Sequence, residues 1–259
     1  MNDTFIRVVA SERPYGYEVS GGNIAGHTTW LKIGFNAAVG ATAEVIAPQG
    51  GAYAFPAAEA HMHIVSSDAA DKGTAEAGTG IRTATVHYLN SAGAEKSETV
   101  TLNGDTIVET DATDIYRIQD FRAVTTGTSL AAVGTITIKN HANAVTYASM
   151  AIGDTSLRQA VWTVPAGKTL YVSDIEVGCV ADAANKYCTV SLKSSYDSYT
   201  ATVLSAGVIV PYSDISLESG VSNLHLFAPL KFPATSDIVV TGVSNSSAVT
   251  QVVLRGWTE

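Results

Sequence analysis

The sequence predicts an all-β fold: tandem antiparallel sandwiches of the jelly-roll type behind an extended N-terminal arm. Short runs of residues alternate between apolar and polar, and clusters of Gly, Asn, Asp and Ser separate them, as is typical of sandwiches and barrels. Helical periodicity is nearly absent, so the chain offers no crossover helices for a parallel sheet. The 22 glycines among 259 residues supply the many turns that such a fold needs.

Composition excludes several classes of function. Fifteen Lys and Arg stand against 24 Asp and Glu, which gives a net charge of -9 and no basic surface for nucleic acid or an anionic membrane. With 46% hydrophobic and only 15% charged residues, the chain can bury a core and is not expected to be disordered. The N-terminus lacks the pattern of a secretory signal, and no apolar run approaches the ~20 residues of a membrane span.

Residues 1–40 form the predicted arm, which is rich in glycine and extended. We expect it to reach a neighbouring subunit through Phe5, Trp30 and Phe35. Near the other terminus, Trp257 is expected at an interface or a packed end of the sheet.

The first predicted sandwich covers residues 41–154. It should contain two hairpins, one joining strands 84–88 and 99–102 and one joining strands 135–138 and 144–147. Each pair flanks a short polar turn, so its pairing is antiparallel.

The second predicted sandwich covers residues 155–259, and in it strands 238–240 and 249–254 flank a Ser- and Asn-rich turn. Cys179 and Cys188 lie on the inner faces of two further strands, where a short loop would place them opposite each other. We expect a pair of buried thiols, with a disulfide as the alternative under oxidation.

A faint internal repeat suggests the division into two sandwiches. Segments 45–53 and 161–171 share one pattern: a short apolar run, a turn containing Pro and Gly, and the beginning of a strand. Each precedes roughly a hundred residues of short strands, which is the size of one sandwich.

The best metal candidate is the pair His61 and His63, because residues at i and i+2 of a strand point to the same face. Cupin-type barrels use this spacing, but Leu170 stands where a second cupin motif would supply its histidine. With no third ligand recognisable, these residues remain weak candidates, and a strand that presents two histidines to solvent or an interface is the alternative. We expect no cofactor and no catalytic residues.

Several turn-and-strand motifs resemble those of a family of virion structural proteins of tailed bacteriophages, especially marine and metagenomic ones. They include the stretches 51–58, 77–83 and 162–169, the last reading Trp-Thr-Val-Pro-Ala-Gly-Lys-Thr. The resemblance covers residues 20–259 and supplies no catalytic residues. It implies a protein located in the virion and assembled in the host cytoplasm.

Taken together, these observations predict a non-enzymatic capsid decoration or cement protein. Its partners would be other virion proteins, namely the major capsid protein or neck and tail proteins, and further copies of itself in a small cyclic homo-oligomer. The alternatives are a tail, neck or fibre-attachment component, a glycan-binding adhesin and, at low weight, a cupin-like metalloenzyme.

Overall fold

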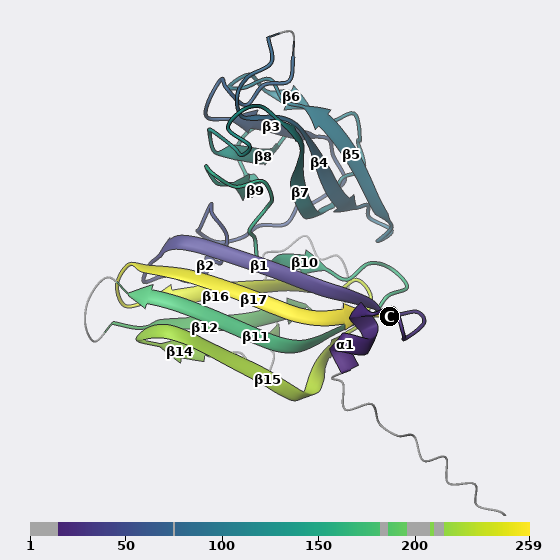
Figure 1. Ribbon diagram of the computed structural model, residues 1–259, viewed down its shortest axis with the longest axis vertical. Coiled ribbons are helices and arrows are strands. Elements are labelled where there is room, and N and C mark those ends of the chain that lie inside the picture. The colour runs from purple at the N-terminus through teal and green to yellow at the C-terminus, as the bar shows by residue number, and fades with distance from the viewer. Residues whose placement is uncertain (1–14, 75, 182–185, 196–207, 210–214) are drawn as a thin grey trace, which may run out of the picture.

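The computed structural model describes residues 15–74, 76–181, 186–195, 208–209 and 215–259. Two β-sandwiches lie one above the other, and the chain enters and leaves the upper one through the lower one (Figure 1). The predicted all-β class with antiparallel sheets is confirmed. None of the described residues forms a helix long and apolar enough to cross a membrane.

The lower sandwich has a four-stranded sheet that contains the first and the last strand of the chain. Its strands, in spatial order, are β1 (Thr28–Val39), β17 (Ala248–Thr258), β11 (Leu170–Ala181) and β15 (Ser219–Phe232). In β11 and in β12 (Cys188–Ser195) of the facing sheet, buried residues occupy alternate positions over most of the strand, which matches the period of two in the sequence.

A second sheet packs against the first. Its strands are β10 (Val161–Thr163), β16 (Asp237–Ser244), β12 (Cys188–Ser195) and β13 (Val208–Ile209), with β14 (Ile215–Leu217) on β12 and β2 (Glu44–Val45) on β16. Chain neighbours such as β11 and β12, or β16 and β17, belong to opposite sheets. This alternation is that of a jelly roll.

One strand of the jelly roll is interrupted. β2 and β10 lie end to end on the same partner, since β2 pairs with residues 241–242 of β16 and β10 with residues 237–239. Between them, Ile46 donates to the carbonyl of Val240, Val240 donates to that of Ala160, and Ala160 donates to that of Ile46, each at 2.9 Å. The upper sandwich is therefore inserted into the middle of a jelly-roll strand.

The inserted sandwich consists of a four-stranded and a three-stranded sheet. The first has the order β6 (Val108–Glu109), β3 (Met62–Ser66), β8 (Ile136–Asn140), β9 (Thr146–Met150); the second has β5 (Glu95–Thr101), β4 (Ile81–Leu89), β7 (Arg117–Thr126). Both predicted hairpins are confirmed as β4–β5 and β8–β9. Burial of Ile64, Val86, Phe121 and Ile138 between the two sheets gives this unit a core of its own.

The predicted division into an arm over 1–40 and tandem sandwiches over 41–154 and 155–259 needs correction. β1 pairs with β17 from Thr28 to Val39, so this part of the proposed arm is an integral strand of the jelly roll. The two similar segments that suggested a repeat, around Val45 and Val161, are the two halves of the interrupted strand.

The last predicted strand pair also needs correction, because β16 and β17 lie in different sheets and do not pair. Cys179 of β11 and Cys188 of β12 also lie in different sheets, so they are not cross-strand neighbours. Cys179 is paired with Thr250 and Gly220 instead. Both cysteines are free thiols buried in the jelly-roll core. Burial raises the pKa of the Cys188 thiol, which accepts a hydrogen bond from Thr250 at 3.4 Å.

Helix α1 (Tyr15–Ser20) docks beside the end of the sheet at which the chain terminates (Figure 1). Tyr15 contacts the ring of Trp257 with a centroid distance of 4.8 Å, and Tyr171 stacks on Trp257 at 5.6 Å. From Tyr15 onward the N-terminal segment thus packs on its own chain, and this end of the sheet is covered by an aromatic cluster.

Candidate functional site

A buried ion pair joins the two sandwiches. Arg117, the first residue of β7, forms two parallel bonds with Asp237, the first residue of β16, at 3.0 and 3.1 Å, and both side chains are 1% exposed. The guanidinium also lies over the rings of Phe55 and Tyr116. Burial raises the pKa of the Asp237 carboxyl, and its bonds to Arg117 and Thr163 oppose that rise. The paired charges hold the insert and the jelly roll in one relative orientation.

A buried amide extends this network. Gln119 of β7 donates to the carbonyl of Thr163 in β10 and accepts from its backbone N–H at 3.1 Å, which imitates a strand pairing between the two units. The Thr163 hydroxyl in turn donates to Asp237. Every polar atom named here has a partner, as buried polar groups require.

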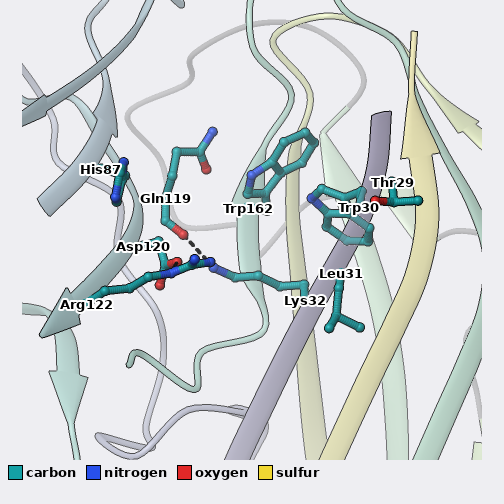
Figure 2. Close-up of a pocket in the computed structure, with 9 residues that line it drawn as sticks. All are labelled: Thr29, Trp30, Leu31, Lys32, His87, Gln119, Asp120, Arg122 and Trp162. Atoms are coloured by element: carbon teal, nitrogen blue, oxygen red, sulfur yellow. Dashed lines mark hydrogen bonds and ion pairs between the residues drawn. The ribbon is translucent and has the colours of Figure 1, made fainter. Parts of the chain in front are cut away.

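Beside the network lies a groove of about 420 Å³ between β1 and β7, which we call the junction groove (Figure 2). It is lined by aromatic rings and charged side chains from both sandwiches, namely Thr29, Trp30, Leu31, Lys32, His87, Gln119, Asp120, Arg122 and Trp162. The indoles of Trp30 and Trp162 contact each other with centroids 5.2 Å apart, and Arg122 pairs with Asp120 on the opposite side. An amphipathic wall of this kind can bind a polar molecule that also has an apolar face.

Lys32 is the unusual group of the junction groove. Its ammonium donates to the backbone carbonyl of Gln119, and the side chain is almost fully buried (Figure 2). Burial lowers its pKa from 10.5 to about 8; Asp120 opposes this shift and Arg122 adds to it. A lysine of this pKa is partly neutral in mildly alkaline solution, so its amine is a better nucleophile than that of an exposed lysine.

The predicted interface residues are largely used within the chain. Trp30 packs on the jelly-roll core, the ring of Phe35 lies under the guanidinium of Arg158 at 4.3 Å, and Trp257 is part of the aromatic cluster around α1. Phe5 lies outside the described residues. Exposed apolar side chains occur elsewhere, on the outer face of the jelly roll.

Three of these, Val180, Val221 and Val249, form what we call the valine patch. Val180 of β11 lies directly opposite Val249 of β17, and Val221 of β15 lies opposite Gly178 of β11, on the same outward face. Their exposed fractions are 63%, 71% and 42%. The sequence prediction missed them because single valines in an alternating strand do not indicate which face is covered.

The predicted pair His61 and His63 lies in the inserted sandwich, where two further residues join it. Glu109 of β6 and His141 of the β8–β9 turn complete a group that we call the histidine cluster. The Oε1 atom of Glu109 is 2.8 Å from His141 Nδ1, 3.0 Å from His61 Nε2 and 3.5 Å from His63 Nε2. Leu170 stands where a second cupin motif would supply a histidine. It lies in the core of the jelly roll, whereas the histidine cluster belongs to the inserted sandwich.

No protein-family model matches the chain, and no curated protein is significantly similar to it. Among solved structures, the chain is similar to the VP2 subviral particle of infectious bursal disease virus, with 10% identity over 90% of this chain and 75% of that one and a TM-score of 0.22. It is also similar to the T13 particle of the same virus, with 12% identity over 90% and 72% and a TM-score of 0.23. Scores this low do not establish a common fold.

Proposed function

We propose that this chain is a non-enzymatic virion structural protein that acts through protein–protein contacts. The observation that carries the proposal is the valine patch on the outer sheet of the jelly roll. The motif resemblance to phage virion proteins and the rigid junction between the sandwiches support it, since an assembly subunit must present its contact surfaces in a fixed relation.

The valine patch is suited to contact with another copy of the chain. Copies with a net charge of -9 repel each other, so an uncharged surface is where they can approach. Gly178 and Ser219, which are paired with Val221 and Val180, carry no charge, and neither does Gln251 opposite Gly178. Exposed apolar patches on an otherwise polar surface mark protein contact sites.

Sedimentation velocity on the full chain tests this contact. We expect concentration-dependent association of the natural protein and its loss in Val180→Glu, because a carboxylate in an apolar contact is left without a partner. Val124→Glu is the matched control, since Val124 is an exposed valine of the inserted sandwich, at 57%. A natural protein that stays monomeric over the whole concentration range, or equal association of Val180→Glu, would exclude the contact.

Within the virion, we propose the decoration or cement role, in which the chain binds the outside of the capsid. Quantitative mass spectrometry of purified particles is the direct test, and a copy number comparable to that of the major capsid protein is the expected result. A few copies per particle would favour a neck, tail or fibre-attachment component instead. Absence from the particles would contradict both.

The junction groove favours glycan binding as a second candidate function. Indole rings stack on the apolar faces of sugars, and the groove combines Trp30 and Trp162 with hydrogen-bonding groups such as His87 and Asp120. A glycan array with the natural protein and Trp162→Ala is the test. Binding that disappears in the variant would support an adhesin; an array without binders would eliminate this candidate.

A further inference from the structure

The histidine cluster collects half of the histidines of the chain, which has six, around one carboxylate oxygen. Its members come from three segments that are distant in the sequence: the beginning of β3, strand β6 and the β8–β9 turn. Strand register fixes part of it, because His63 lies directly opposite Glu109 on one side and Lys139 on the other. The inference drawn from this cluster does not depend on the proposed virion role.

Three of the four donor side chains already have their ligand atoms close together. The ligand atoms of His61, Glu109 and His141 lie within 4.8 Å of one another. In a tetrahedral zinc site, where Zn–N distances are about 2.0–2.1 Å, neighbouring donors are about 3.3 Å apart. His61 and His141 are exposed or half-exposed side chains, so rotation of their side-chain torsions can close the remaining difference without movement of the sheet.

The tautomer of His63 is the second observation. Its Nδ1 atom lies 2.9 Å from Oδ1 of Asn143, and because an amide oxygen only accepts, Nδ1 carries the proton and donates it. In the neutral ring Nε2 then carries a lone pair, and this lone pair faces the Glu109 carboxylate at 3.5 Å. Two lone pairs face each other favourably only if a cation or a second proton lies between them.

Asn143 accepts a hydrogen bond from the ring nitrogen of His63 that faces away from Glu109. A ligating histidine usually donates its other ring N–H to an oxygen acceptor, which fixes the ring orientation and the tautomer. Asn143 lies in the β8–β9 turn with a φ of +58°, in the left-handed region that asparagine tolerates in turns.

We propose that His61, His63, His141 and Glu109 form a binding site for a divalent transition-metal ion. Three imidazoles and one carboxylate are a donor set of the kind that zinc, nickel and copper prefer to magnesium or calcium. The bound ion ties the β8–β9 turn to β3 and β6. Lys139 is the neighbouring positive charge that the ion must tolerate, and the Glu109 carboxylate offsets it.

Calorimetric titration of the untagged full chain with Zn²⁺ alone tests the site. We expect one equivalent to bind, with the affinity reduced at least tenfold in His141→Ala and also in Glu109→Gln. His225→Ala is the matched control, because His225 is an exposed histidine of the jelly roll, at 75%, that is likewise paired with a carboxylate. Circular dichroism of each variant checks that the fold is retained.

Two further measurements separate a metal site from a hydrogen-bonded cluster. Co²⁺ in place of Zn²⁺ should give the visible absorption of a tetrahedral nitrogen and oxygen site, and Zn²⁺ should raise the melting temperature of the natural protein but not that of His141→Ala. Equal Zn²⁺ affinity of the natural protein and His141→Ala, or no binding at millimolar Zn²⁺, would overturn the proposal.

Discussion

Lys32 is a charged residue in a position where an edge strand meets the underside of another sandwich. Its aliphatic stem fills space between β1 and β7, and its ammonium has a backbone carbonyl as hydrogen-bond partner. The cost of burying the charge appears as the lowered pKa of about 8. Because of this cost, the contribution of Lys32 to stability rises with pH, whereas that of a lysine in a surface ion pair falls.

The sign follows from proton linkage. Because the pKa of Lys32 is about 8 in the folded protein and 10.5 in the unfolded chain, the unfolded chain binds a proton first as the pH falls from 10.5. Lys32 should therefore lower the free energy of unfolding by about 3 kcal/mol as the pH falls from 10.5 to 8, and by no more below that. In Lys32→Met this dependence should be absent, as measured by urea unfolding across the pH range.

Lys168→Met is the control for Lys32→Met, because Lys168 is an exposed lysine. Its pH profile should run parallel to that of the natural protein. Parallel profiles for Lys32→Met as well would mean that the ammonium of Lys32 is not buried in solution.

At the scale of the element, the interrupted strand makes a special demand on the strand that passes it. Gly34 of β1 lies against the point where Ile46 and Ala160 meet, and a Cβ atom there would be 2.5 Å from both the Ile46 carbonyl oxygen and the Ala160 Cβ atom. Only glycine allows β1 to approach the break this closely.

Gly34→Ala should therefore lower the free energy of unfolding by about 3 kcal/mol, since overpacking against backbone forces the strand to shift. Gly178→Ala is the matched control in β11 of the same sheet, where the nearest atom to an added Cβ is a Val221 methyl at 3.9 Å. Denaturant unfolding of both variants measures the difference. A cost that is the same for the two would show that β1 moves away from the break without difficulty.

The elements differ in how far the sequence could predict them. The hairpins β4–β5 and β8–β9 are local, since alternation and a turn between the strands specify both partners. β1 is paired with the last strand of the chain, and no local pattern marks a partner so distant. It was therefore predicted as an arm. The two halves of the interrupted strand, β2 and β10, have similar sequences, and this similarity predicted a repeat. Both halves in fact pair with the same strand, β16.

The candidate sites show the same limit. His61 and His63 were visible as a pair on one strand face, whereas Glu109 and His141 join them only through the pairing of β3 with β6 and β8. Lys32 gives no signal in the sequence, because its burial depends on β7 of the other sandwich. A site that is assembled from distant segments can be recognised only when the order of the strands in the sheets is known.

For the whole molecule, Arg117 and Asp237 decide whether the two sandwiches act as one body. Replacing Asp237 by Ala should lower the free energy of unfolding by about 3–5 kcal/mol, because the guanidinium is left buried without its counter-charge. The double variant Arg117→Met/Asp237→Leu should lose less than Asp237→Ala, since it leaves no unpaired charge. Calorimetry should show one unfolding transition for the natural protein and separate transitions for Asp237→Ala.

A double-mutant cycle over Arg117 and Asp237 isolates the coupling energy of the pair from the loss of packing. Arg122→Met is the control, because Arg122 is exposed, at 66%, and its ion pair with Asp120 lies within one strand. Additive effects at Arg117 and Asp237, together with a single transition in every variant, would mean that the remaining contacts suffice to unite the sandwiches.

The break in the jelly-roll strand is a point at which the inserted sandwich can be removed or replaced by protein engineering. Because Ile46 and Ala160 are already joined by a hydrogen bond, the whole upper sandwich can be removed and its ends closed by a short turn without stretching the rest of the chain. The jelly roll would then be a platform and the upper sandwich an exchangeable module, provided that Asp237, which loses Arg117, is replaced by an uncharged residue. A different module could be grafted at the same point, presented on the same scaffold.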